Sequence, residues 1–196
     1  MSKYFINSFI FPIIFSIFVS IFFIPFFYSG NFNIICEFEN NNTFQESAST
    51  FSWPTPSYKN ITSGFGYRKS PATGASSYHG GIDIGAPQGS KIFATMSGKI
   101  NYVGFNGANG YTVKISHANG YESTYGHVSP NFVVSVGEYV LQGQHIANVG
   151  PKYVEKKSFT TYTDSTGKCT NGATTGPHLH FALSKNGTRI NPLSVF

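Results

Sequence analysis

The chain has 196 residues, of which 40% are hydrophobic, 17% aromatic and only 11% charged. Average chains carry about 25% charged residues, so this composition excludes a disordered chain and disfavours a salt-bridged helical bundle. From Phe51 onward, 12 Lys and Arg residues stand against 5 Asp and Glu residues, a net charge of +7 that suits an anionic partner such as a membrane surface or a cell wall. The basic residues are scattered without an arginine-rich cluster, so nucleic acid is not expected as a partner.

Residues 1–30 are expected to form a membrane anchor or signal segment. The stretch from Tyr4 to Tyr28 consists almost entirely of Phe, Ile, Val, Ser and Pro, and no charged residue lies between Lys3 and Glu37. A helix of about 20 apolar residues crosses a bilayer, whereas a cleavable signal has roughly 7–15 apolar residues before an Ala-x-Ala-like site. The length favours one N-terminal transmembrane or signal-anchor helix, with a cleaved signal as the alternative.

The charge before this span indicates its orientation. Lys3 and the amino terminus precede the apolar residues, and positively charged flanks stay on the cytoplasmic side. We therefore expect an extracytoplasmic C-terminal part, which is anchored to the membrane, or secreted if the segment is cleaved.

Residues 31–57 are rich in Asn, Ser and Thr and are expected to be a polar linker. From residue 58 to 196, short runs of β-branched and aromatic residues alternate with Gly, Asn and Pro, as is typical of short strands. The runs are KIFATMSGKINYVGF, YTVKISH, YESTYGHV, NFVVSV and HLHFALSK. Asn-Gly pairs at 109–110, 119–120 and 186–187 indicate hairpin turns. We predict one all-β domain of mostly antiparallel strands.

Residues 151–176 have no clear periodicity and are expected to be a long insertion loop. Loops of this length are usually functional lids or solvated mobile segments, and the sequence leaves both open. Two cysteines, Cys36 and Cys169, are too few for a disulfide framework, so two independent thiols are expected.

Histidines provide the first indication of chemistry. His79 and Asp83 are four residues apart, and His178 and His180 are two apart. On a strand, either spacing places both side chains on one face. Each pair alone is weak evidence, because an exposed polar face would explain it equally well.

A catalytic zinc site needs three nitrogen or oxygen ligands and one open position. His79, Asp83 and one histidine of the 178/180 pair would supply such a set. His117 and His145 lack a comparable context and are expected to be structural. The chain contains no His-Glu-x-x-His helix motif, no Gly-x-Ser-x-Gly elbow and no P-loop.

Six motifs occur in a fixed order across the last 140 or so residues. They are SGFGYR (63–68), HGGIDIGAPQG (79–89), YGHV (125–128), VGEYVLQGQ (136–144), GPHLHF (176–181) and NPL (191–193). In this combination, the stretch from about Tyr58 to Phe196 resembles the M23 family of zinc metallopeptidases, the lysostaphin/LytM type of peptidoglycan endopeptidase.

The resemblance implies an antiparallel β-domain with a groove. It also implies that Zn²⁺ is bound by His79, Asp83 and His180, and that His127 and His178 are catalytic histidines that do not bind the metal. Which of these two is the base is left open. Arg68, in the first motif, is interpreted as structural.

The implied function is hydrolysis of peptide bonds in peptidoglycan stem peptides or cross-links, by attack of a water that zinc activates. The partners are then peptidoglycan peptides, and the membrane through the N-terminal helix, with the protein a monomer. The alternative is a membrane-tethered, non-catalytic scaffold or activator of cell-wall enzymes with the same fold.

Two departures from the family pattern stand out. The connection between Gly150 and Gly176 is longer than usual, which leaves the groove wall there undefined. Ala182 follows Phe181 where Glu is common in the family, and it is expected to point away from the metal.

Overall fold

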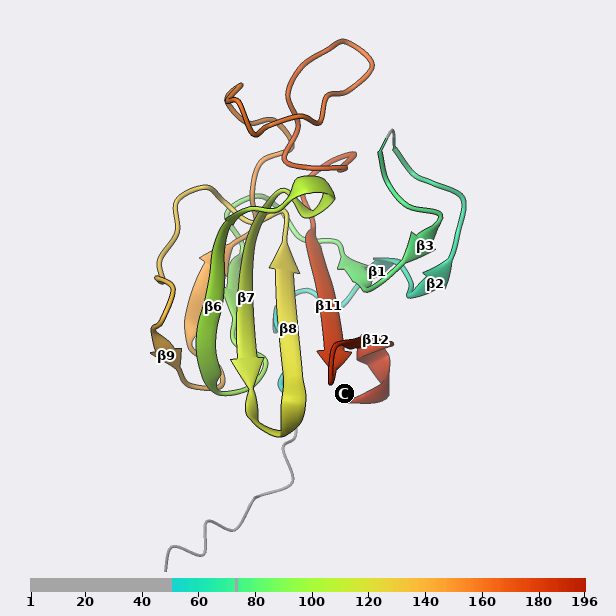
Figure 1. Cartoon of the computed structure of the whole chain (residues 1–196). Helices are drawn as coiled ribbons and strands as arrows, with labels where there is room; N and C mark the ends of the chain where they lie inside the picture. The colour runs from blue at the N-terminus through green and yellow to red at the C-terminus, as the bar shows by residue number, and fades with distance from the viewer. Residues whose placement is uncertain (1–50, 73) are drawn as a thin grey trace, which may run out of the picture. The chain divides into compact units, whose positions relative to one another are not determined.

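The computed structural model describes residues 51–72 and 74–196 (Figure 1). The expected membrane anchor, residues 1–30, and most of the expected linker lie outside the described residues. Within the described part, no helix has the length and apolarity needed to span a membrane.

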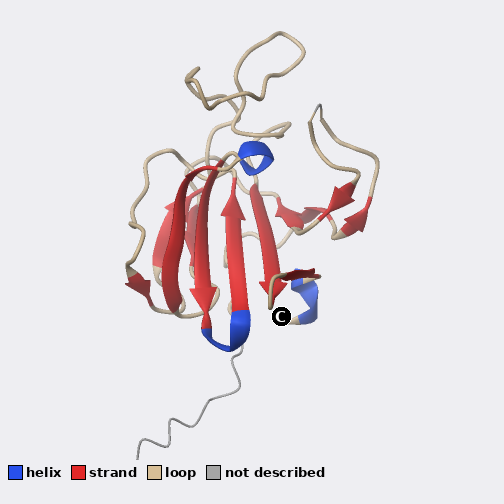
Figure 2. Cartoon of the chain, viewed as in Figure 1, coloured by secondary structure: helices blue, strands red, loops and turns tan. Residues whose placement is uncertain are grey.

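The described residues form an all-β domain, as the sequence predicts, and their helical segments are single 3₁₀ turns (Figure 2). The strands are β1 (Ile61–Ser63), β2 (Gly66–Tyr67), β3 (Tyr78–His79), β4 (Ile82–Ile84), β5 (Lys91–Phe93), β6 (Gly98–Phe105), β7 (Tyr111–His117), β8 (Tyr121–Gly126), β9 (Tyr139–Val140), β10 (His145–Asn148), β11 (Leu179–Lys185) and β12 (Thr188–Ile190). The 3₁₀ turns are η2 (Gly107–Asn109), η3 (Ala118–Gly120) and η4 (Pro192–Ser194).

The main sheet has the strand order β1-β4-β11-β8-β7-β6-β9, and β12 also pairs with β11 (Figure 1). Each pairing is antiparallel. Two small sheets, β5 with β10 and β2 with β3, complete the domain. The C-terminal strand β11 thus lies between β4, which comes early in the domain, and β8.

Alternation along β11 separates the core from the opposite face of the sheet. Leu179 and Phe181 are fully buried and belong to the hydrophobic core. Tyr125 of β8 is opposite Phe181, and the two ring centroids are 5.4 Å apart. Since neighbouring residues of a strand point to opposite faces, His180 and Ala182 lie on the other face. Packing of Leu179 and Phe181 in the core therefore fixes β11 with His180 on the opposite face.

A buried hydrogen-bond network crosses the core side of the sheet. His117 Nδ1 donates to the Ser97 carbonyl at 3.0 Å, so its Nε2 accepts from the Ser123 hydroxyl at 2.7 Å. The Tyr125 hydroxyl lies 3.1 Å from Ser123 Oγ and accepts the Thr95 N–H at 2.9 Å. Burial lowers the pKa of His117 and raises the pKa of Tyr125 to about 12. His117 is thus a neutral structural histidine, as predicted.

Two of the three predicted Asn-Gly turns have the backbone of a type I′ hairpin. Asn119 and Gly120 have φ of 56° and 70°, and Asn186 and Gly187 have φ of 48° and 80°. Positive φ at both central residues matches the twist of the joined strands. Asn109, in contrast, ends the 3₁₀ turn η2, and of the pair 109–110 only Gly110 has a positive φ.

The prediction of a strand at 131–136 (NFVVSV) is wrong. Val134 is buried, but Val133 and Val136 are 49% and 62% exposed in an irregular loop. The edge beside β6 is occupied instead by β9, through the pairs Gly98–Val140 and Lys99–Tyr139. Residues 131–136 thus form no strand, and the chain reaches the main sheet only afterwards, at β9.

The expected boundary between linker and domain at residue 58 also needs correction. Ser52 N–H donates to Thr95 O at 2.8 Å, and Pro54 O accepts from Phe93 N–H at 2.9 Å. The Trp53 ring lies 4.9 Å from the Phe196 ring, centroid to centroid. These contacts include residues 51–57 in the folded domain.

Gly81 is required by a close approach between the start of β4 and β11. A Cβ there would lie 2.5 Å from the Phe181 carbonyl oxygen and 3.0 Å from His180 Cε1, closer than such atoms pack. At Gly80 the nearest atom to a Cβ would be Arg189 Cγ, at an ordinary 3.7 Å. Neither glycine has a positive φ, so space alone distinguishes the two positions.

We expect Gly81→Ala to lower the free energy of unfolding by about 1–3 kcal/mol, because the added methyl forces β4 away from β11. Urea denaturation of the purified protein measures the change. Gly80→Ala is the matched control and should stay close to wild type. Equal stability of the two variants would contradict the close approach.

We expect Tyr125→Phe to cost about 1–3 kcal/mol, since it leaves the buried Thr95 N–H without its acceptor while keeping the ring. The measurement is again the free energy of unfolding in urea. Tyr139→Phe, at a side chain that is 65% exposed, removes the same hydroxyl from the surface and should have no measurable effect. A Tyr125→Phe protein as stable as this control would refute the network.

Candidate metal centre

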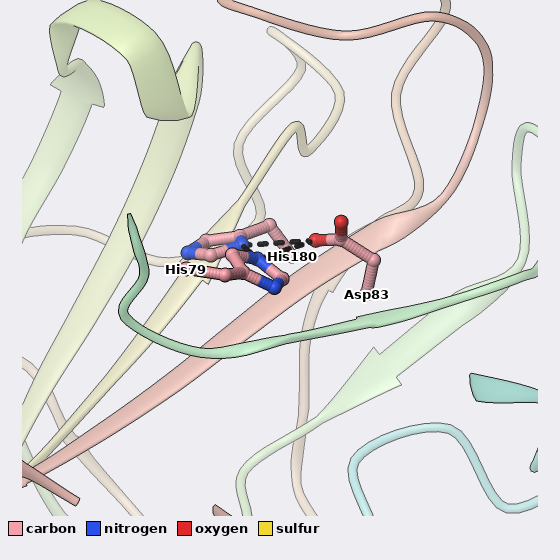
Figure 3. Close-up of side chains that lie close together, drawn as sticks. All are labelled: His79, Asp83 and His180. Carbon is pink, nitrogen blue, oxygen red and sulfur yellow. Dashed lines mark hydrogen bonds and ion pairs between the residues drawn. The ribbon is translucent and has the colours of Figure 1, made fainter. Parts of the chain in front are cut away.

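Three ligand atoms from three strands converge on one face of the main sheet (Figure 3). His79 ends β3, Asp83 is the central residue of β4, and His180 lies opposite Asp83 in the register of β4 with β11. His79 Nε2, Asp83 Oδ1 and His180 Nδ1 are separated by 3.0 to 3.1 Å in each pair. The structure thus brings together the three residues expected to bind the metal. A bend at Gly80–Gly81 separates His79 from Asp83, so the two do not share one continuous strand.

Further hydrogen bonds orient two of these ligands. His79 Nδ1 donates to the Gly64 carbonyl at 2.8 Å, which leaves Nε2 as the ligand atom. Arg68 Nη1 donates to Asp83 Oδ2 at 3.0 Å and also to the Ser63 hydroxyl. Because Oδ2 is occupied, Oδ1 faces the two imidazoles. Arg68, interpreted from the sequence as structural, thus orients the carboxylate.

The charges at the centre suit a divalent cation. Burial opposes ionisation of Asp83, but its contacts with His178, His180 and His79 together hold its pKa far below the ordinary value. Burial also lowers the pKa of His180. Metal ligands must be deprotonated, and an anionic carboxylate beside a neutral imidazole meets that condition near neutral pH.

This donor set fits zinc. Zinc binds nitrogen and oxygen at about 2.0–2.2 Å in a tetrahedron, which places ligand atoms about 3.3 Å apart. The observed separations of 3.0 to 3.1 Å are close to that value. Among the described residues, His79, Asp83 and His180 form a group that could hold a metal ion. Three protein ligands leave a fourth position open, as in catalytic zinc sites.

His127 lies next to this cluster in a constrained conformation. Its φ of 55° is in the left-handed region, which costs about 1–3 kcal/mol for a residue other than glycine and occurs mainly at functional sites. Its Nδ1 donates to the Asn171 carbonyl at 2.7 Å. Burial, together with the neighbouring His178 and His180, lowers the pKa of His127 to about 3. The ring is therefore neutral near pH 7, with Nε2 left for a ligand or substrate.

His178 is the second histidine beside the cluster. Its Nδ1 donates to the Gly176 carbonyl at 2.9 Å, and its Nε2 lies 3.6 Å from Asp83 Oδ1. The ring centroids of His127 and His178 are 4.7 Å apart. The two expected catalytic histidines thus lie side by side, next to the three expected ligands. His178 also approaches the carboxylate of Asp83.

Asn171 was missed by the sequence analysis, because its contacts are distant in the chain. Its side chain is fully buried, accepts from Tyr111 N–H at 2.8 Å and donates to the Val128 carbonyl at 2.9 Å. The same residue supplies the carbonyl that holds His127. The inner end of the 151–176 insertion is therefore part of the site.

The expectation for Ala182 is wrong. Residues 180 and 182 are two apart and share a face of β11, and the position of a Cβ at Gly81 would lie 2.9 Å from Ala182 Cβ and 3.0 Å from His180 Cε1. Ala182 therefore points to the same side as the metal ligand.

Two further side chains lie elsewhere. His145 Nε2 contacts Asn148 Oδ1 at 3.0 Å on β10, away from the cluster, as predicted for a structural histidine. Cys169 is a buried free thiol, and Cys36 lies outside the described residues.

The five site residues line a single cleft of about 580 Å³. Its walls include the β1–β3 region, the η2 turn, the end of the insertion and Arg189 of β12. The groove expected from the resemblance is thus present, with the ligand cluster at its wall.

Comparison with known proteins gives relatives for most of this domain. The chain is 39% identical over 138 residues to the DD-carboxypeptidase/endopeptidase Mpg of Neisseria meningitidis, covering 70% of this chain and 27% of that protein. It is 33% identical over 139 residues to the peptidoglycan DD-endopeptidase ShyC of Vibrio cholerae, covering 70% and 28%. The chain therefore spans about a quarter of the length of these relatives.

A solved structure and a family model agree with this relationship. A zinc-containing peptidase from Vibrio cholerae superposes with a TM-score of 0.57 at 30% identity, over 73% of this chain and 39% of that one. The model of peptidase family M23 matches residues 77–192, which include all three ligand residues and both neighbouring histidines. Zinc is the cofactor that this family and the donor set share. The chain belongs to peptidase family M23.

Proposed function

We propose that the chain is a zinc-dependent endopeptidase that hydrolyses peptide bonds in the stem peptides or cross-links of peptidoglycan. One observation carries this proposal: His127 and His178 line the same cleft as a three-ligand centre, and neither belongs to the ligand triangle. A structural zinc site is closed by four protein ligands and does not need such a pair. The relatives named as peptidoglycan DD-endopeptidase and DD-carboxypeptidase/endopeptidase support the substrate class.

The roles of the residues follow from their contacts. His79, Asp83 and His180 would hold the zinc. When bound, zinc supplies Lewis acidity, which polarises a peptide carbonyl and lowers the pKa of water toward about 7. His127 and His178 each donate Nδ1–H to a backbone carbonyl and so keep Nε2 for the reaction. One imidazole accepts a proton from the attacking water at Nε2, and the other, when protonated at Nε2, stabilises the oxyanion or protonates the leaving amine.

The proposed location is outside the cytoplasm, where peptidoglycan is found. The apolar stretch 4–28, with Lys3 before it, would direct the domain there as an anchor or as a cleaved signal. A monomer suffices for the chemistry, because one chain supplies all five proposed site residues.

We expect His180→Ala to abolish stoichiometric zinc binding, because it removes one of three ligands, while His178→Ala keeps most of the zinc. Elemental analysis by mass spectrometry after dialysis against zinc buffer measures the content of each protein. Comparable zinc loss in both variants would make His178 a ligand. A wild-type protein that takes up no zinc would instead favour the non-catalytic scaffold.

We expect the wild-type protein with zinc to release peptide fragments from defined muropeptides, and chelation of the metal to stop the reaction. His178→Ala should slow hydrolysis by about 10²–10⁴-fold, the range for loss of a general acid or base. Mass spectrometry of the products reports both the activity and the bond that is cleaved. Absence of fragments from several wall types would refute the proposed activity.

A further inference from the structure

Arg189 is a cation of the cleft that the proposed chemistry leaves without a role. It lies on β12, opposite Ser184 of β11, and therefore shares a sheet face with Ala182 and His180. It is half-buried and lines the same cleft as the metal ligands. We infer that Arg189 binds a carboxylate of the substrate peptide, next to the bond that is cleaved.

The position of the Arg189 side chain is defined by two contacts. A Cβ at Gly80 would lie 3.7 Å from Arg189 Cγ and 3.9 Å from Cδ, so the aliphatic part passes over the residue next to the ligand His79. At the other end, Nη1 is 3.4 Å from the hydroxyl oxygen of Thr124, a buried residue of β8. The guanidinium is thus directed across the outer face of β11 and has one long hydrogen bond.

No carboxylate neutralises this guanidinium within residues 51–72 and 74–196. The ion pairs found there all involve Asp83, whose arginine partner is Arg68. Glu122, the acidic residue of β8, accepts from Asn101 instead. A half-buried guanidinium without an anion loses part of its hydration with little compensation, whereas a bound carboxylate would restore two hydrogen bonds.

Ala182 contributes to this lack of a partner. It lies opposite Thr124 in the register of β11 with β8, and Thr124 is the residue that the guanidinium contacts. Alanine has no polar group, so this position supplies no anion to Arg189.

The remaining charges of the cleft favour the same ligand. Its lining contains the cations Arg68, Lys69 and Arg189 against one carboxylate, Asp83. Asp83 already faces Arg68 and two imidazoles. An arginine fork matches the two oxygens of a carboxylate and binds them more specifically than a lysine does. This inference rests on the proposed function, since stem peptides of peptidoglycan carry free carboxylates near their amide bonds.

The test compares two synthetic substrates: a cross-linked stem-peptide dimer with free carboxylates, and the same dimer with these groups converted into primary amides. The wild-type protein should favour the free acid by about tenfold in kcat/KM, mainly through KM, because the amide cannot form the charge-assisted pair with the guanidinium. Arg189→Gln should hydrolyse both dimers equally well. Arg189→Lys should keep part of the preference, because it retains the charge without the fork.

A matched control separates local recognition from the overall charge of a basic domain. Lys91→Gln removes the same charge from β5, at an exposed residue outside the cleft lining, and should keep the full preference. A wild-type protein without preference, or an Arg189→Gln protein that retains it, would overturn the inference. So would a loss of preference in Lys91→Gln equal to that in Arg189→Gln.

A second variant tests the role of Arg189 by a substitution on β11, the strand that pairs with β12. Ala182→Glu places a carboxylate opposite Thr124 and should reduce the preference by pairing with Arg189. Its melting temperature shows whether the protein is folded. A folded Ala182→Glu protein with the full wild-type preference would count against the inference, and a misfolded one leaves the decision to Arg189→Gln.

Binding measurements distinguish this inference from the proposed activity. Titration calorimetry of both dimers into zinc-loaded protein should give the same roughly tenfold ratio, now between dissociation constants, and Arg189→Gln should abolish it. If no dimer is hydrolysed but the binding ratio is observed, the proposed activity fails and the role of Arg189 stands. If hydrolysis occurs without a preference in either assay, the role of Arg189 fails alone.

Discussion

The site depends on the register between β4 and β11. In this register Asp83 faces His180, two residues that are 97 positions apart in the chain. Side chains alternate along a strand, so a slip of one residue would direct either ligand into the core. The apolar neighbours Ile82, Ile84, Leu179 and Phe181, all fully buried, make such a slip costly. The hydrophobic core therefore specifies the metal centre by fixing which face each ligand occupies.

The carboxylate of Asp83 contacts the imidazoles on one side and Arg68 on the other. One oxygen faces the imidazoles, and the other accepts from Arg68. A buried carboxylate without partners would be protonated or would destabilise the fold. With Arg68 on one side, the charge is present before any metal arrives. The fold thus holds an anionic centre in advance, which reduces the reorganisation that metal binding requires.

Much of this arrangement could be predicted from the sequence, because it depends on local periodicity. The spacing of His178 and His180 and the Asn-Gly pairs at 119 and 186 indicated strands and turns that the structure contains. Residues 131–136 have the composition of a strand but pair with no strand of the described structure, and composition does not report whether a partner strand lies alongside. Asn171 acts through a main-chain carbonyl and through contacts with β7 and with Val128 after β8, which no local pattern encodes. The orientation of Ala182 could have been deduced from parity alone.

The long connection between Gly150 and Gly176 is closed at its base. Asn171 N–H donates to Lys152 O at 2.9 Å, and Tyr153 pairs with Thr170 in an isolated bridge. The chain enters and leaves the segment 154–169 at these pairings, here called the neck. Asn171, next to the neck, accepts the hydrogen bond from His127 Nδ1. Chain length beyond the neck can therefore change with little effect on the position of His127, since closing a longer loop adds only a small entropy cost. The neck thus separates a segment that does not line the cleft from residues after it, such as Ala173 and His178, that do.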